Sequence, residues 1–245
     1  MDSGYYAAFT GLVAKTEALD VAASNLANAS TTGFKAQKEF YRSVMASLRG
    51  SRLGPLNRAV NNYGVLGGAS IDLSAGTPER TGNDLDMALE GSGFFLVQTS
   101  SGVKYTRNGS FRIGASGRLE TAAGDAVLGE QGPIELPSGP VSISPDGTLS
   151  QKGAVVARLK LVDFPPGTSL QAEGNSLYAA PAGSARPAPD PRVRQGMLEA
   201  SNLNPVVGAV SLVALQRHTE MLQRALSIFN SDFNRTAAEE LPRVG

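Results

Sequence analysis

The sequence predicts an α+β protein in which coiled-coil helices at the N- and C-terminal ends flank a central all-β domain of sandwich or barrel-like type. Near both ends, apolar residues recur in steps of three and four, the heptad spacing of helices that pack side by side. The middle is rich in turn residues, with most of the 28 Gly and 14 Pro of the 245-residue chain, and contains short alternating runs typical of strands. We therefore expect an assembly helix and turn at 1–34, a connector at 35–68, the β domain at 69–180, a linker and return segment at 181–203, and a second assembly helix at 204–245.

The first helix is expected to begin at Asp2 or Ser3, which are good N-caps, and to end near Asn28. Gly33 permits a positive φ, and the Ser/Thr residues around it favour side-chain-to-backbone bonds over helix, so the helix should stop within 28–34. The apolar seam of this helix, with one Thr, consists of Tyr5, Phe9, Leu12, Thr16, Leu19, Ala23 and Leu26.

The last helix is expected from Pro205, a favourable first helical residue after the N-cap Asn204, to about Thr236. Residues 181–191, rich in Pro and Ala, are expected to form an extended, solvated linker before it. The seam of this helix consists of Leu212, Leu215, Thr219, Leu222, Leu226, Phe229 and Phe233.

In the middle of the chain, Gly, Pro and Asn residues mark the expected turns between loops and strands. Residues 35–48 have weak helical spacing and are interpreted as a short helix or an extended connector, 49–68 as a loop, and the β region as starting near Ala69. Asn108-Gly109 is the strongest two-residue hairpin signal, and Asp146-Gly147 indicates a second hairpin. Residues 155–164 alternate as one strand that stops at the following prolines.

Composition narrows the function. Lys plus Arg equals Asp plus Glu, 22 each, so the basic excess of nucleic-acid or anionic-membrane binding is missing. The chain has no cysteine, which excludes thiol catalysis and Cys-based metal sites and is compatible with an oxidising compartment. The first 20 residues lack the features of a cleaved signal peptide, and no apolar run is long enough to span a membrane. Delivery outside the cytoplasm would therefore need a route without a cleaved Sec-type signal.

Short motifs in one order along the chain resemble bacterial flagellar rod and hook proteins. They are SNLANASTTGFK (24–35), LDMALEGSGFF (85–95), YTRNGSF (105–111), GRLET with AVLGE (117–130) and RQGMLEASNLNPV (194–206). The opening residues, the exact form of the first motif and two later segments most resemble the proximal-rod branch of this family, and a distal-rod or hook-type subunit is the alternative.

The resemblance implies a structural subunit of the flagellar basal-body rod in the periplasm. Such a subunit is exported through the flagellar type III apparatus without a cleaved signal peptide, and it polymerises with copies and paralogues through its terminal helices. It implies no enzyme activity, cofactor or metal. Besides the seams, we expect Gly33 and Phe34 in the turn to serve assembly, Asn25 to form an interhelical hydrogen bond, and Asn28 to cap the helix end.

Two other classes of function are considered. Asp84, Asp86 and Glu90 could act as paired carboxylates in an envelope peptidoglycan hydrolase, although a polar strand face or a turn after Gly82-Asn83 is the simpler interpretation. The single histidine, His218, has no Cys or acidic pair beside it and is interpreted as a solvated or interfacial residue. The remaining class is a secreted adhesin, which would be a stable monomer with ordered ends.

Overall fold

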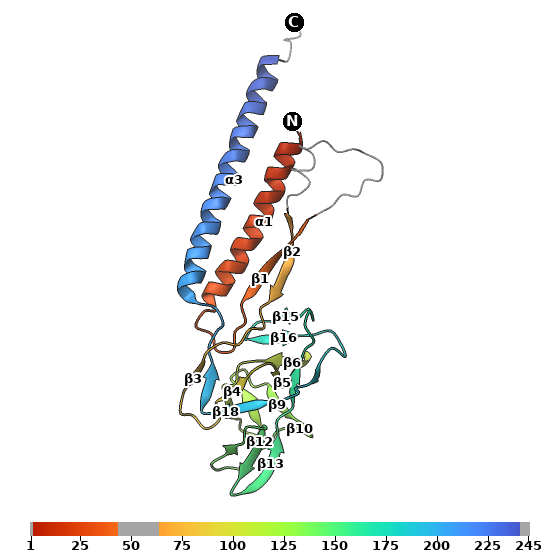
Figure 1. Cartoon of the computed structure of the whole chain (residues 1–245), viewed down its shortest axis with the longest axis vertical. Helices are drawn as coiled ribbons and strands as arrows, with labels where there is room; N and C mark the ends of the chain where they lie inside the picture. Colours follow the sequence, from red (N-terminus) through yellow and green to blue (C-terminus); the bar gives the residue numbers. More distant parts are fainter. Residues whose placement is uncertain (1, 44–63, 241–245) are drawn as a thin grey trace. The chain divides into compact units, whose positions relative to one another are not determined.

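The computed structural model describes residues 2–43 and 64–240, and its α+β class agrees with the sequence (Figure 1). Helix α1 (Asp2–Ala27) and helix α3 (Pro205–Glu240) stand at the two ends, with antiparallel strands between them. The chain separates into two compact units. The helical unit contains α1, α3 and most of the strand pair β1–β2, and the β unit contains residues 27–37 and 70–205.

Both helices begin where the sequence places them. After Ala27 the carbonyl of Asn28 accepts the N–H of Thr31 at 3.0 Å, and Gly33 has a φ of +66°, so the helix ends in the expected turn. Helix α3 begins at Pro205 and continues past the expected end, to Glu240. Among the described residues, neither helix combines the length and apolarity needed to cross a membrane.

The connector is extended in its described parts. Strand β1 (Gln37–Ser43) pairs with β2 (Gly64–Ile71) in a two-stranded sheet, so the region expected as a short helix or a connector begins with a strand. The loop expected up to residue 68 is shorter, because β2 already begins at Gly64. The rest of the expected connector, 44–63, lies outside the described residues.

The largest sheet in the described residues has ten strands, and its main path is β15-β16-β6-β5-β9-β8-β7. The strands on this path are β5 (Phe94–Thr99), β6 (Gly102–Thr106), β7 (Phe111–Ile113), β8 (Leu119–Thr121), β9 (Ala126–Gly129), β15 (Gln171–Ala172) and β16 (Leu177–Ala179). Strands β10 (Gly132–Pro133), β14 (Leu161–Asp163) and β17 (Arg186–Pro187) join it off this path.

Smaller sheets complete the β unit. Strands β11 (Ser142–Ile143), β12 (Thr148–Gln151) and β13 (Ala154–Arg158) form a three-stranded sheet. Strand β4 (Met87–Glu90) pairs with β18 (Arg192–Gln195), and β3 (Pro78–Arg80) pairs with β19 (Met197–Glu199).

The hairpin expected at Asn108-Gly109 does not form. Strand β6 before it pairs with β5 and β16, and β7 after it pairs with β8. A Cβ on Gly109 would lie 1.7 Å from the carbonyl oxygen of Met87, whose N–H donates to the Gly109 carbonyl at 3.0 Å. The Asn-Gly pair is therefore a corner packed on the backbone at the start of β4, because a tertiary contact there overrides the local hairpin preference.

The other strand expectations differ in outcome. The hairpin at Asp146-Gly147 is confirmed, since β11 and β12 pair across it. The run expected as one strand at 155–164 is instead two strands, β13 and β14, in different sheets. The segment expected as a solvated linker supplies β17 and is followed by β18 and β19, so it belongs to the β unit.

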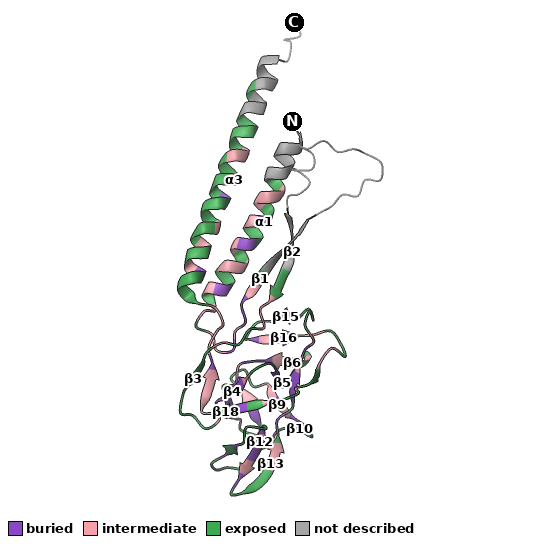
Figure 2. Ribbon diagram, in the orientation of Figure 1, coloured by how far each residue is buried: buried purple, intermediate pink, exposed green. Residues whose placement is uncertain are grey.

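The core of the β unit consists of two clusters of buried residues. Figure 2 shows buried segments in purple on several strands of this unit. Strand β5 supplies both: Phe95 and Val97 point into the larger cluster, and Phe94 and Leu96 into the smaller one. This is the alternation of a strand that is buried on both faces. Strand β5 is thus the central element from which the surrounding strands take their positions.

Candidate functional site

The turn after α1 is built into the β unit through its backbone. The N–H of Gly33 donates to the carbonyl of Glu199 at 2.7 Å, and the backbone of Gly33 approaches that of Asn108 so closely that a Cβ would lie 2.2 Å from the Asn108 nitrogen. Only glycine fits this approach and this φ together. Gly33, expected to serve assembly between subunits, is therefore buried within its own chain.

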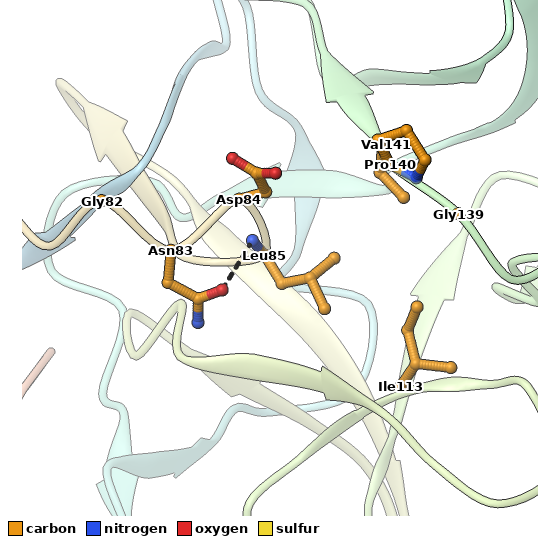
Figure 3. A pocket seen from close by; sticks show the side chains of 8 residues that line it. All are labelled: Gly82, Asn83, Asp84, Leu85, Ile113, Gly139, Pro140 and Val141. Atoms are coloured by element: carbon orange, nitrogen blue, oxygen red, sulfur yellow. Dashed lines mark hydrogen bonds between the residues drawn. The ribbon is translucent and has the colours of Figure 1, made fainter.

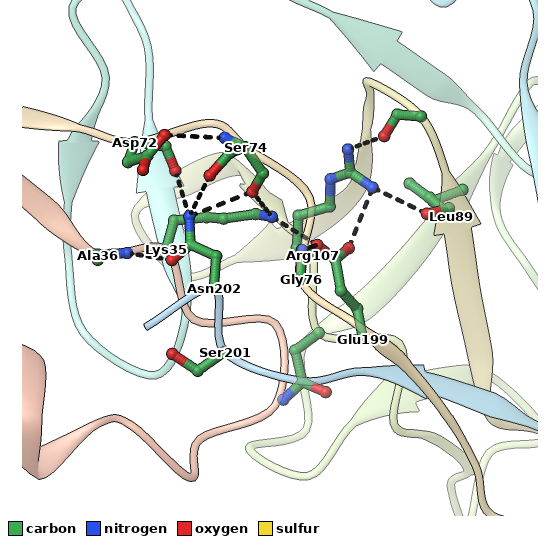
Figure 4. A network of polar contacts seen from close by, with 12 residues as sticks. Lys35, Ala36, Asp72, Ser74, Gly76, Leu89, Arg107, Glu199, Ser201 and Asn202 are labelled. Carbon is green, nitrogen blue, oxygen red and sulfur yellow. Dashed lines mark hydrogen bonds and ion pairs between the residues drawn. The ribbon is translucent and has the colours of Figure 1, made fainter. Parts of the chain in front are cut away.

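Beside this turn, three charged side chains form a buried ion cluster (Figure 4). Lys35, Arg107 and Glu199 are each 1% exposed. The ammonium Nζ of Lys35 lies 2.5 Å from Oε1 of Glu199, and the Nη1 of Arg107 lies 3.1 Å from Oε2 of the same carboxylate. One carboxylate thus lies between two cations that come from distant parts of the sequence.

Backbone carbonyls satisfy most of the remaining donors. Lys35 Nζ also donates to the Ser74 carbonyl at 2.6 Å. The Arg107 guanidinium donates to the carbonyls of Leu89 and Gly91 and lies 5.5 Å from the centre of the Phe94 ring. Its Nε is buried without a partner. The glutamate also accepts the N–H of Gly76 at 2.7 Å.

Burial governs the electrostatics of the cluster. Desolvation lowers the pKa of both Lys35 and Arg107 from their ordinary values, and the neighbouring Glu199 carboxylate partly offsets this by favouring the charged forms. The Tyr178 hydroxyl accepts the backbone N–H of Lys35 at 2.9 Å, and burial raises its pKa to about 12. The cluster is held in a low-dielectric setting, where removal of one partner has a large effect.

Asn202 makes a second connection between the terminal segments (Figure 4). Its Oδ1 accepts the N–H of Ala36 at 2.8 Å, and its Nδ2 donates to the carbonyls of Asp72 and Ser74 at 2.9 and 3.2 Å. The segment after α1 and the segment before α3 are therefore hydrogen-bonded to each other directly. Both also contact residues 72–76, which follow strand β2. We call Lys35, Arg107, Glu199 and Asn202 the terminal clamp.

The carboxylates considered for hydrolysis are not gathered in one site. Asp84 lines an open depression of about 360 Å³ together with Ile113 and Pro140 (Figure 3). Asp86 is buried and accepts a hydrogen bond from Asn83 at 3.1 Å, and Glu90 pairs with Arg194 beside a different depression. This arrangement does not support paired-carboxylate catalysis.

The described residues hold no group of three or more His, Asp or Glu side chains able to bind a metal ion. His218 is exposed on α3, in agreement with its interpretation as a solvated residue.

Helix α1 buries a different face from the expected seam. Ala14, Ala18 and Asn25 are buried, at 6%, 0% and 8% exposure, so the small residues make the covered face. On the opposite face, Phe9 is 49% exposed, and Thr16 and Ala23 are also exposed. The expected seam residues Leu12, Leu19 and Leu26 are half-buried at its margin.

The expected seam of helix α3 is buried or half-buried over most of its length. Thr219 is buried, and the four leucines of the seam, Leu212, Leu215, Leu222 and Leu226, are half-buried. Phe229, however, is 51% exposed. The side chains of Tyr5 and Phe233 lie outside the described part of the structure.

The turn residues have clear local roles. Asn28, expected to cap the helix end, accepts the Thr31 hydroxyl at 3.2 Å as well as its N–H. The carbonyl of Phe34 accepts the N–H of Asn202 at 3.4 Å, so this residue also touches the return segment.

The charged members of the terminal clamp were missed by the sequence reasoning. Lys, Arg and Glu are the residue types least often fully buried, so composition argues against the observed placement. The one signal present is that each lies inside a different resembling motif: Lys35 at the end of the first, Arg107 in the third and Glu199 in the last. That signal marks the segments, and burial of the charges follows only from the fold.

Comparison with known proteins places these segments in one family. The family model for the flagella basal body rod protein matches residues 6–35, that for the D1 domain of the flagellar hook protein FlgE/F/G matches 88–155, and that for the C-terminal part of the flagellar basal body rod FlgEFG proteins matches 194–238. The flagellar basal-body rod protein FlgF of Caulobacter vibrioides is 33% identical over 252 aligned positions, which cover 100% of both chains. The chain belongs to the flagellar basal-body rod protein family.

Other members of the flagellar rod family show the same collinear match. FlgF of Salmonella typhimurium is 34% identical, with 96% of this chain and 98% of the relative covered. FlgG of Bacillus subtilis is 29% identical, with 86% of this chain and 89% of the relative covered. The terminal clamp takes one charged residue from each of the three matched segments, so it joins all the parts by which the family is recognised.

Proposed function

We propose that this chain is a structural subunit of the proximal part of the flagellar basal-body rod and polymerises through its terminal helices. The observation that carries the proposal is the match over the whole chain to relatives named FlgF, at 33% and 34% identity in two of them. Relatives that carry a different name, FlgG, match less closely, at 28% and 29% identity. We therefore favour the proximal-rod assignment over the distal-rod or hook-type alternative.

Coiled-coil packing between subunits is part of the same proposal. It is supported by heptad spacing on both helices and by apolar side chains that stay exposed on them, such as Phe9 on α1 and Phe229 on α3. In a single chain these apolar side chains stay in contact with water and add no stability. Helices of neighbouring subunits would bury them, which is favourable.

Delivery by the flagellar type III export apparatus to a periplasmic rod is also proposed. The absence of cysteine supports it in one respect, because refolding after passage needs no disulfide chemistry. Loss of the chain from the cell envelope in a strain that lacks the export apparatus is the expected result. Unchanged envelope levels in that strain would contradict this route.

Quantitative mass spectrometry of purified hook–basal bodies from the native cells tests the proposal. We expect this chain to be present at fewer copies than the distal-rod subunit. A larger share than the distal-rod subunit would assign it to the distal rod, and absence from the basal bodies of flagellated cells would overturn the rod proposal. A peptidoglycan zymogram of the purified chain should show no clearing.

A further inference from the structure

Helix α1 carries an exposed heptad stripe opposite its buried face. Phe9, Val13, Thr16, Asp20 and Ala23 follow one another in steps of four and three, and all are exposed, Phe9 and Val13 at 49% and 43%. The exposed Glu17 flanks this stripe and adds a second acidic side chain. We call the five residues Phe9, Val13, Thr16, Asp20 and Ala23 the α1 stripe; Glu17 lies beside it.

Helix α3 carries a second heptad stripe, distinct from its leucine seam. Its exposed members alternate in steps of three and four, and the apolar ones Val207, Val210, Met221 and Ile228 are 57% to 66% exposed. The stripe consists of Val207, Val210, Ala214, Arg217, Met221, Arg224 and Ile228. We call it the α3 stripe.

The charges on the two stripes are complementary and unsatisfied. Among the described residues, Asp20 and Glu17 on α1 make no ion pair, and neither do Arg217 and Arg224 on α3. Each stripe thus presents an apolar row interrupted by charge of one sign, acidic on α1 and basic on α3. A flanking or interrupting charge of this kind sets partner choice and register in helix pairs.

We propose that the α1 stripe of one copy docks on the α3 stripe of a second copy in antiparallel direction, with Asp20 opposite Arg217. This deepens the proposed rod function and rests on it. The same register sets Phe9 opposite Ile228, Thr16 opposite Met221, and Ala23 opposite Ala214. It also sets Val13 opposite Arg224, one helical turn from Glu17.

The direction follows from the order of the steps in the two stripes. The α1 stripe read forward from Phe9 and the α3 stripe read backward from Ile228 both have steps of four, three, four and three, so in the antiparallel alignment every member of the α1 stripe faces a member of the α3 stripe. In a parallel alignment with the same ion pair, positions 9, 16 and 23 would face positions 206, 213 and 220, which lie outside the α3 stripe.

Disulfide cross-linking between two single-cysteine chains tests the contact without background, because the natural chain has no cysteine. Full-length Thr16→Cys and Met221→Cys chains are co-expressed in place of the natural protein, and the basal bodies are isolated and oxidised. We expect a covalent dimer that contains one chain of each kind. The matched control is Thr16→Cys with Gln223→Cys, since position 223 is exposed but turned about 200° from Met221 around the helix.

The outcomes separate this inference from the rod proposal. Both variants present in basal bodies at natural copy number, with a dimer at least five-fold stronger for Met221 than for Gln223, supports the contact. The same copy number without that preference, or a Met221→Cys cross-link to a different rod protein alone, overturns it and leaves the rod proposal intact. Absence of the natural chain from basal bodies overturns both.

Charge exchange gives a second readout. Asp20→Arg alone sets two like charges opposite each other, and we expect the Thr16–Met221 cross-link to fall several-fold. Asp20→Arg combined with Arg217→Asp restores the opposite signs and should return the cross-link to within two-fold of its original strength. A double variant no better than the single one contradicts the proposed register.

Discussion

Glu199 is the residue on which the connection of the terminal segments depends most. It is the carboxylate partner of Lys35 and of Arg107, and its carbonyl also accepts the N–H of Gly33. Two buried cations share one buried anion, so the loss of that anion leaves charge with no counter-ion in a place that water does not reach. The backbone carbonyls around the cations lessen this penalty without cancelling a net charge.

Glu199→Gln should lower the free energy of unfolding by about 3–5 kcal/mol, because it leaves two cations buried without a carboxylate. Urea unfolding followed by tyrosine fluorescence measures it. Glu173→Gln is the matched control: Glu173 pairs with Lys104 but its side chain is 38% exposed, so its loss should cost about 0–1 kcal/mol. Equal effects of the two substitutions would contradict the central role of Glu199.

The raised pKa of the Tyr178 hydroxyl makes the free energy of unfolding depend on pH in the alkaline range. Its pKa in the folded chain, about 12, is above its ordinary value of 10.0, so its protonated form contributes stability below pH 10 and that contribution is lost as pH rises toward 12. The lowered pKa of Lys35 acts in the opposite direction, but only up to its ordinary value of 10.5.

Between pH 10.5 and 12, the free energy of unfolding should therefore fall more steeply in the natural chain than in Tyr178→Phe. Urea unfolding at several pH values in this window gives the two slopes, and ultraviolet titration should show a phenol ionisation near pH 12 that Tyr178→Phe lacks. Parallel slopes would show that this hydroxyl ionises as it does in the unfolded chain.

At the scale of elements, both terminal helices have two faces with heptad spacing, and the fold covers one on each. In α1 the covered face is lined by Ala14 and Ala18, whose small side chains give almost no signal in a hydrophobic pattern. Two larger apolar residues of α1, Phe9 and Val13, face outward. Spacing alone cannot rank two such faces, because it records which residues share a side and not what lies against that side.

The same substitution on the two faces of α1 should separate them. Ala18→Leu overfills a fully covered position and should cost about 1–3 kcal/mol. Ala23→Leu, on the exposed side, should stay within about 0.5 kcal/mol of the natural chain. Thermal melting of the helices, followed by circular dichroism of the purified chain, compares them, and identical melting curves would show that the Ala18 face is not packed in solution.

Aspartate in either seam tests the assembly role of the helices. Leu19→Asp and Leu222→Asp place a charge among half-buried apolar residues of the helical unit, outside both core clusters of the β unit. We expect an unchanged near-ultraviolet spectrum of the β unit and loss of the chain from isolated basal bodies. Normal motility and incorporation of both variants would contradict the role of the seams.

At the scale of the whole molecule, the chain closes its β unit with segments from both ends. Residues 27–37 and 192–205 lie with the central strands, and both core clusters and the terminal clamp are contained in this unit. The segment that follows α1 and the segment that precedes α3 are thus bonded to each other within the β unit.

A chain restricted to residues 27–205 should fold without the helices, since the contacts that define the β unit stay within it. Its free energy of unfolding in urea should agree with that of the β unit in the full chain within about 0.5 kcal/mol. Lys35→Met removes a partner of Glu199 that lies inside the fragment, so it should destabilise the fragment as much as it destabilises the full chain. A fragment that fails to fold, while the full chain does, would show that the helices stabilise the β unit.

Local signals and the family resemblance are enough to predict one part of this structure. The ends of α1 and the start of α3 follow from capping residues, from Gly33 and from Pro205, and the Asp146-Gly147 hairpin follows from a short-range turn signal. The tertiary structure alone decided the strand partners around Asn108-Gly109, the covered face of α1 and the burial of Lys35, Arg107 and Glu199. These depend on contacts between residues far apart in the chain, where close backbone approach and desolvation outweigh the preferences that a short stretch of sequence expresses.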